Sequence, residues 1–131
     1  MTQNGEFCKG LRVLLVEDEA IIAMLTEHML REMGCDDVHI VGTVQMALSA
    51  IERDPPDVAV LDVNIRGEMV LPVARKLAEA GIPFAFATGY GKTEILADFH
   101  HYPILQKPFD LPDLENALRH ALARHQRVNV G

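Results

Sequence analysis

The side chains of this sequence that could take part in binding or catalysis follow directly after short apolar runs. They are Glu17 and Asp18 after the first run, Asp62 after the third, Thr88 after the fourth and Lys107 after the last. Three carboxylates brought together cannot all stay ionised cheaply, because each charge disfavours the ionised form of the others. Lys107 supplies one positive charge, and a hard divalent cation bound by oxygen atoms would balance the rest.

This set of ligands favours Mg²⁺, which binds one or two carboxylates, keeps several waters and commonly bridges to phosphate. Mn²⁺ prefers similar ligands and can substitute. The set contains no thiolate or imidazole, which argues against zinc or copper. The same residues suit phosphoryl transfer to an aspartate. The carboxylate acts as the nucleophile, while the metal and the ammonium group neutralise charge on the phosphoryl oxygens.

Five short apolar runs are expected to form the strands that position these residues. They cover residues 11–16, 38–41, 58–61, 84–87 and 104–106. The first, third and fourth are almost continuously apolar, as is typical of parallel strands covered on both faces.

Helical periodicity fills the segments between the runs. Asp18 is expected to cap a helix that continues to about Met33, and Thr43 to cap a second. A third helix should end at Gly81, and Asp110 should cap the last. Four methionines are expected to fill the core: Met24, Met29, Met33 and Met46.

A short helix within residues 91–100 completes an alternation of five strands and five helices. This order predicts an α/β fold, a flavodoxin-like (βα)5 doubly wound parallel sheet with strand order 2-1-3-4-5. Its ligand crevice should lie at the carboxyl ends of the strands, where the first and third part. The fold would therefore bring the candidate residues into one site.

Composition and charge restrict the class of protein. The 131 residues, 49% hydrophobic and 24% charged, indicate one globular domain. A net charge of −7 argues against a nucleic-acid partner, which requires a basic face. We find neither a signal peptide nor a membrane span, and we expect a cytoplasmic protein without a membrane partner. Cys8 and Cys35 lack metal-type spacing and are too few for a disulfide framework, so we expect reduced thiols.

Four motifs follow these strands in order: LLVEDE, VLDVNIRG, FATGY and LQKPF. With these motifs the sequence resembles the receiver domain of bacterial two-component response regulators, over about residues 11–125. The FATGY motif resembles a subgroup of stand-alone receivers. Residues 1–10 would then be a lead-in and 126–131 a tail, which leaves no residues for an output domain.

The resemblance implies a role for each acidic residue of the site. Asp62 would be phosphorylated by a phosphohistidine of a histidine kinase or of a histidine phosphotransfer protein. Asp18 would ligate Mg²⁺ directly, Glu17 through water, and Asn64 through its backbone carbonyl.

The resemblance also implies a switch. Thr88 would hydrogen-bond the phosphoryl group, and Lys107 would pair with Asp62 or with its phosphoryl group. Tyr90 is interpreted either as part of the output face or as a packed surface aromatic. Two positions depart from the receiver pattern: Arg66 replaces a usual proline, and Ile104 replaces the aromatic residue that usually moves with the threonine. We therefore expect activation to reorganise residues 89–101.

The expected function is a phosphoacceptor switch that signals to a downstream protein, which the sequence does not identify. It would not be a metabolic enzyme, because it would catalyse only its own phosphorylation and dephosphorylation. One alternative is a phosphate sink or phosphorelay shuttle without a downstream target. Another is a flavodoxin-type redox module, which the acidic residues after the first run disfavour, because they would repel the phosphate of FMN. A phosphorylation-independent scaffold is disfavoured because every catalytic position is filled.

Overall fold

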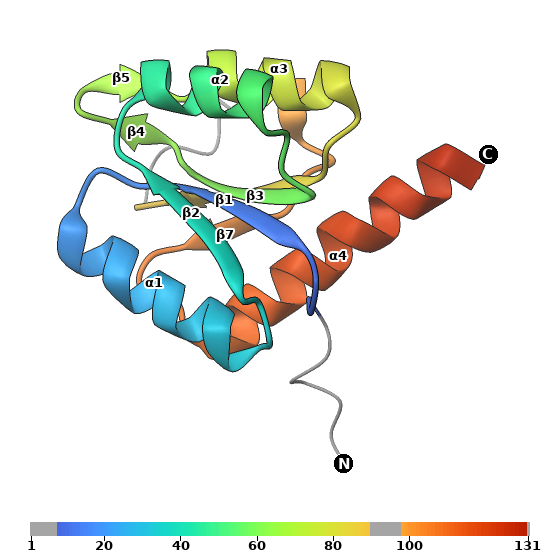
Figure 1. The fold of residues 1–131 in the computed structure, drawn as a ribbon, viewed down its shortest axis with the longest axis horizontal. Helices are drawn as coiled ribbons and strands as arrows, with labels where there is room; N and C mark the ends of the chain where they lie inside the picture. Colours follow the sequence, from blue (N-terminus) through green and yellow to red (C-terminus); the bar gives the residue numbers. More distant parts are fainter. Residues whose placement is uncertain (1–7, 90–97, 131) are drawn as a thin grey trace.

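The computed structural model describes residues 8–89 and 98–130, and of residues 125–130 only the helical backbone. A five-stranded parallel sheet has helices on both faces (Figure 1). Its strand order is β2-β1-β3-β6-β7. The five strands are β1 (Arg12–Val16), β2 (Asp37–Val41), β3 (Val58–Asp62), β6 (Phe84–Thr88) and β7 (Ile104–Gln106). In order along the chain this is the expected 2-1-3-4-5 arrangement, so the flavodoxin-like fold is confirmed.

The helices lie in two layers. Helices α2 (Val44–Arg53) and α3 (Leu71–Ala80) cover one face of the sheet, and α1 (Ala20–Glu32) and α4 (Leu111–Val130) cover the other (Figure 1). Since β1 connects through α1 to β2 on one side while β3 lies on its other side, the chain direction across the sheet reverses between β1 and β3. The switch point, where this fold is expected to have its ligand crevice, therefore lies between β1 and β3.

Alternation along each strand divides the core between the two layers. On β6, Phe84 and Phe86 belong to the core under α2 and α3, whereas Ala85 and Ala87 belong to the core under α1 and α4. Successive strand residues point to opposite faces, so a continuous apolar run supplies both cores. Small residues on one face allow α4 to lie close to the sheet there.

Three of the expected helix signals are present. The Thr43 hydroxyl accepts a hydrogen bond from the Met46 amide at 3.0 Å and caps α2. Gly81 ends α3 in the left-handed conformation with φ 75°. Asp110 accepts from the Asp113 amide at 3.0 Å, while the Asp113 side chain accepts from the Asp110 amide at 3.2 Å. This reciprocal pair fixes the start of α4.

The expected cap of α1 was wrong. Glu19, not Asp18, occupies the N-cap position, and its side chain makes no capping hydrogen bond. The Asp18 carboxylate instead accepts from the Arg66 amide at 3.1 Å, in a segment 48 residues away. A long-range partner of this kind leaves no signal in local sequence.

The structure also differs from the sequence prediction in a hairpin, in the last helix and in two methionines. A short antiparallel hairpin of β4 (Asn64–Ile65) and β5 (Glu68–Met69) follows β3, and the sequence did not predict it. Helix α4 continues to Val130, so the segment expected to be a tail is helical up to that residue. The helix expected within 91–100 lies largely outside the described residues. Two methionines expected in the core, Met24 and Met46, are exposed.

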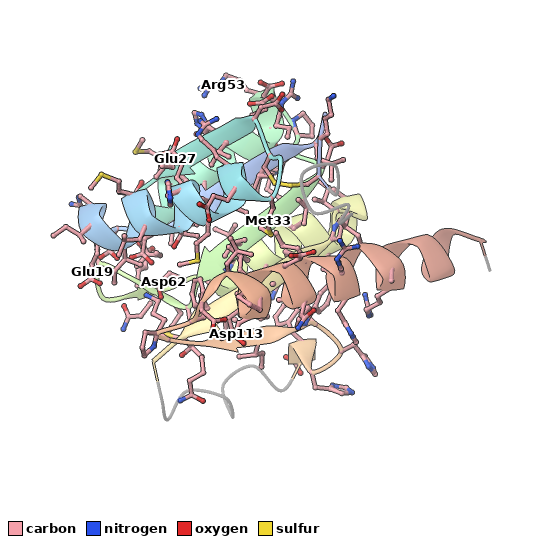
Figure 2. All side chains as sticks on the ribbon, turned by 90° about the horizontal axis from the view of Figure 1, so that it is seen from below. Glu19, Glu27, Met33, Arg53, Asp62 and Asp113 are labelled. Atoms are coloured by element: carbon pink, nitrogen blue, oxygen red, sulfur yellow. A yellow bond between two sulfur atoms is a disulfide. The ribbon has the colours of Figure 1, made fainter. Side chains whose placement is uncertain are left out.

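The expectation of reduced thiols was also wrong. Cys8 and Cys35 form a disulfide, with their Cα atoms 5.0 Å apart; Figure 2 draws disulfides as yellow bonds. Both cysteines are buried in the core beneath α1 and α4. Cys8 precedes β1 and Cys35 precedes β2, so the bond lies at the amino-terminal edge of the sheet, opposite the crevice. Only packing of the segment before β1 against the α1–β2 turn brings the two sulfurs together.

No helix among the described residues combines the length and apolar character needed to cross a membrane.

Candidate functional site

Two neighbouring parallel strands position the carboxylates. Val16 of β1 pairs with Leu61 of β3; Glu17 follows β1 directly, and Asp62 is the last residue of β3. Glu17 and Asp62 therefore emerge side by side at the carboxyl edge of the sheet, with Asp18 next in the chain. One carboxylate oxygen from each of the three lies within 4.8 Å of the others. The sheet has brought together the acidic cluster that the sequence predicted.

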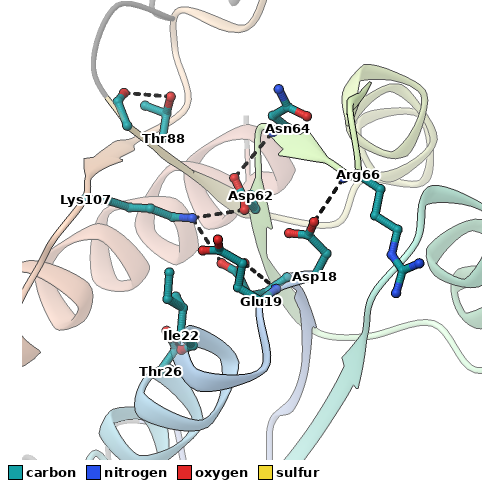
Figure 3. A network of polar contacts seen from close by, with 11 residues as sticks. Asp18, Glu19, Ile22, Thr26, Asp62, Asn64, Arg66, Thr88 and Lys107 are labelled. Atoms are coloured by element: carbon teal, nitrogen blue, oxygen red, sulfur yellow. Dashed lines mark hydrogen bonds and ion pairs between the residues drawn. The ribbon is translucent and has the colours of Figure 1, made fainter.

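Lys107 crosses from the β7–α4 loop to the same cluster. Its Nζ lies 3.0 Å from Asp62 Oδ2 and 3.2 Å from Glu17 Oε1 (Figure 3). Asp62 and Glu17 are only 8% and 5% exposed. Water therefore solvates neither carboxylate well, and both depend on Lys107 as a partner. The peptide bond from Lys107 to Pro108 is cis. The Lys107 side chain is 19% exposed.

Burial and charge shift the titration of two groups. Burial raises the pKa of Glu17 from 4.5 to about 6, and the charge of Asp62 adds to this effect. Hydrogen bonds from the Glu19 amide and Lys107 oppose the shift without cancelling it. Burial would lower the pKa of Lys107, but its contacts with Asp62 and Glu17 outweigh that effect and raise the pKa above its usual value. Lys107 is therefore the firmly charged member of the site.

Each carboxylate also accepts a hydrogen bond from a backbone amide. Glu17 Oε2 accepts from Glu19 at 3.0 Å, and Asp62 Oδ1 accepts from Asn64 at 3.3 Å. Asp18 Oδ2 accepts from the Arg66 amide at 3.1 Å. These bonds fix the orientations of the oxygens before any ligand arrives.

Thr88 lies on the other side of the site. It ends β6, and in Figure 3 it lies on the opposite side of Asp62 from Asp18. The buried hydroxyl donates to the Gly89 carbonyl at 2.9 Å, and the Thr88 carbonyl accepts from the Lys107 amide at 2.8 Å. Tyr90 lies outside the described residues.

The donor set fits a hard divalent cation. The cluster offers three carboxylates and no sulfur or imidazole, and the charge of Lys107 only partly balances it. Asn64 is placed at the edge of the cluster by its amide hydrogen bond to Asp62. The sequence missed the contribution of Arg66, whose amide reaches Asp18. The Arg-Gly pair between Ile65 and Glu68 was the available turn signal, although it is weaker than Asn-Gly or Asp-Gly.

Ile104 occupies the position at which the receiver pattern usually has an aromatic residue. It is 38% exposed on the edge strand β7. The neighbouring Tyr102 stacks on Phe84 with ring centroids 4.0 Å apart. Phe99 packs against both rings. The aromatic side chains of this region therefore belong to the core beside β6.

Comparison with known proteins gives one consistent result. A family model described as the response regulator receiver domain matches residues 13–119. The solution structure of SdrG from Sphingomonas melonis Fr1 is 40% identical, with a TM-score of 0.77 over 93% of this chain and 99% of SdrG. The BeF3-activated conformation of SdrG from Pseudomonas melonis Fr1 is 42% identical, with a TM-score of 0.72 over 83% of this chain and 93% of that one.

Another relative is longer than this chain. Transcriptional regulatory protein PdtaR of Mycobacterium tuberculosis is 31% identical over 98% of this chain. The match covers 65% of PdtaR, so the chain spans slightly less than two thirds of that relative's length.

Proposed function

Because the chain belongs to the response regulator receiver domain family, we propose that it accepts a phosphoryl group on Asp62 in a Mg²⁺-dependent reaction. The donor is a phosphohistidine of a histidine kinase or of a histidine phosphotransfer protein, and the phosphorylated chain changes its affinity for another protein. The observation that carries this proposal is the Asp62 carboxylate, held 3.0 Å from Lys107 within the acidic cluster. BeF3 activation of the related SdrG supports a link between Asp62 chemistry and conformation.

The transfer is a single displacement at phosphorus. An oxygen of Asp62 forms the new bond to phosphorus as the bond from phosphorus to the donor imidazole nitrogen breaks. The imidazole nitrogen keeps the electron pair, and the ring takes a proton from water, so it leaves as neutral imidazole. Asp62 needs no general base, because a carboxylate, unlike a hydroxyl, attacks without giving up a proton. Burial of the site strengthens these interactions relative to water.

The surrounding residues stabilise charge and hold the metal. Lys107 faces the developing charge on the phosphoryl oxygens, because its ammonium already contacts the accepting carboxylate. Asp18 and Asp62 would ligate Mg²⁺ directly, Glu17 through a water, and Asn64 through its backbone carbonyl; Mn²⁺ can substitute. A divalent cation held by these residues would supply positive charge to the phosphoryl oxygens. The same residues would support slow dephosphorylation, so the chain remains a switch and not a metabolic enzyme.

Thr88 offers a buried hydroxyl that could donate a hydrogen bond to the new phosphoryl group. In the present state its hydroxyl donates to the Gly89 carbonyl at 2.9 Å. A phosphoryl oxygen carries more negative charge than a carbonyl and makes the stronger hydrogen bond. We propose that the hydroxyl turns to it, and that residues 89–101, with Tyr90, reorganise in response. Hydrogen exchange with and without beryllofluoride tests this step; unchanged protection in that segment would contradict it.

An exposed apolar surface lies beside the site on α1. Ile21, Met24 and Leu25 are 69%, 60% and 55% exposed. A groove of about 320 Å³ opens between α1 and the segment that contains Lys107. It is lined by Ile22, Leu25, Thr26, Met29, Lys107, Pro108 and Phe109. We propose that the phosphodonor protein docks on this surface, because a donor histidine must approach Asp62 from nearby. A kinase-linked receiver of this kind would act in the cytoplasm.

The acceptor is tested by labelling the chain from acetyl phosphate and from a phosphorylated histidine kinase. Asp62→Asn should abolish hydroxylamine-sensitive labelling, because an amide is a far poorer nucleophile. Asp36→Asn changes an exposed acid at the opposite edge of the sheet and should label like the wild type. Stoichiometric labelling of the Asp62→Asn variant would refute the assignment.

The remaining alternative is a phosphate sink or phosphorelay shuttle, which has the same site but no downstream target. Pull-downs with the unphosphorylated and the phosphorylated protein distinguish the two. A partner captured only by the phosphorylated protein supports the switch, whereas capture limited to kinases and phosphotransfer proteins supports the sink or shuttle.

A further inference from the structure

The β4–β5 hairpin ends in an unusual turn. Asn64 pairs with Met69 and Ile65 with Glu68, which leaves Arg66 and Gly67 as the two turn residues. Both have positive φ, 54° for Arg66 and 80° for Gly67. Among the described residues, Arg66 is the one non-glycine residue with positive φ. This conformation is unfavourable for a side chain with a Cβ, so the surrounding structure must hold it in place.

Contacts at the base of the hairpin provide that support. Ile65 and Val70 are fully buried in the core under α2 and α3. The Val70 amide donates to the Val63 carbonyl at 2.9 Å, which closes the loop behind the hairpin. The hairpin is therefore anchored in the core and hydrogen-bonded to Val63, the residue that follows Asp62.

Arg66 contacts the acidic cluster through its backbone. Its amide donates to Asp18 Oδ2 at 3.1 Å, whereas its side chain is exposed and points away from Asp62 in Figure 3. A proline, which the receiver pattern usually places at this position, could not make this contact. Proline has no amide hydrogen, and its φ is fixed near −65°.

The need for this contact follows from how the three carboxylates are held. Glu17 and Asp62 both contact Lys107 in addition to one backbone amide each. Lys107 makes its ion pairs with Glu17 and Asp62, whereas the half-buried Asp18 receives its orienting hydrogen bond from Arg66. A carboxylate has lone pairs enough to accept one amide and bind a cation at the same time.

We propose that the Arg66 amide is a positioning group for Asp18, which it holds ready to ligate the divalent cation. This inference rests on the proposed function, in which Asp18 is a direct metal ligand. Hydrogen bonds to metal ligands reduce the freedom that the ligand must lose when it binds the ion. The chain would thus use a strained two-residue turn after β3 to orient a ligand that follows β1.

The test changes one atom. An amide-to-ester substitution at residue 66, with the arginine side chain retained, removes the donor and leaves the turn otherwise intact. Arg66→Pro removes the same donor, while Arg66→Gly and Arg66→Ala keep it. Metal affinity is measured by electron paramagnetic resonance of free Mn²⁺, with Mg²⁺ as competitor, and folding by circular dichroism. The ester should bind about tenfold more weakly or worse, and Arg66→Gly and Arg66→Ala should bind like the wild type.

The outcomes separate this inference from the proposed function. A folded ester variant that binds Mn²⁺ as tightly as the wild type overturns the positioning role, and so does equal weakening in Arg66→Ala and the ester. If Arg66→Pro does not fold, the ester alone decides. A wild-type chain that binds neither Mn²⁺ nor Mg²⁺ would instead refute the metal-dependent function itself.

Discussion

Replacing Glu17 by glutamine removes one of the buried negative charges at the carboxyl edge of the sheet. The side chain keeps its size and can still accept from the Glu19 amide, whose hydrogen bond to Glu17 is 3.0 Å long. Lys107 keeps its partner Asp62 at 3.0 Å. The substitution therefore isolates the cost of holding an ionised Glu17 in the site without metal.

The size and sign of that cost follow from the pKa. Burial raises the pKa of Glu17 from 4.5 to about 6. The folded state thus binds the proton more tightly than the unfolded state does. This contribution to stability is fully present below pH 4.5 and is lost as the pH rises through about 6. The loss is at most about 2 kcal/mol, and less where water reaches the site.

Urea unfolding in EDTA, from about pH 5 to about pH 8, measures this contribution. The free energy of unfolding of the wild type should fall relative to that of Glu17→Gln as the pH rises. Glu19→Gln alters an exposed neighbouring acid and should run parallel to the wild type. Added Mg²⁺ should restore wild-type stability, because a ligand of the folded state stabilises it. A difference between wild type and Glu17→Gln that does not change with pH would refute the reasoning.

Four further substitutions test other parts of the structure. Lys107→Ala leaves Asp62 without its cationic partner, so phosphorylation from acetyl phosphate should be poor. The phosphorylated variant should also fail to bind a partner protein. Partner binding at the wild-type level would contradict this. Asp18→Ala should weaken Mg²⁺ binding strongly and Glu17→Ala less, in calorimetric titration; equal losses would argue against a water-mediated Glu17. Cys8→Ser opens a disulfide with a sequence separation of 27 and should lower the free energy of unfolding by about 3–4 kcal/mol. Phosphorylation of Cys8→Ser should be unchanged, and dithiothreitol should remove the stability difference, so a difference that persists in the reductant would show another cause.

Sequence determined the strands and therefore the place of the site. Continuous apolar runs identify strands buried on both faces, and β1, β3 and β6 emerged at those runs. Once the strands are parallel, their carboxyl ends must share an edge, so Glu17, Asp62 and Thr88 were predictable as neighbours. Local capping at Thr43 and Gly81 was equally readable, because each of these signals acts within one helical turn.

Which groups pair with one another depends on how the elements pack in three dimensions. Asp18 carries the same local signal whether it caps α1 or accepts from Arg66, 48 residues away. Likewise, nothing in the spacing of Cys8 and Cys35 shows that Cys8 packs against the α1–β2 turn. Periodicity reports which face of an element is buried and thus fixes the layers. The choice among distant partners depends on the angles and distances between those layers, which arise only when the whole core packs.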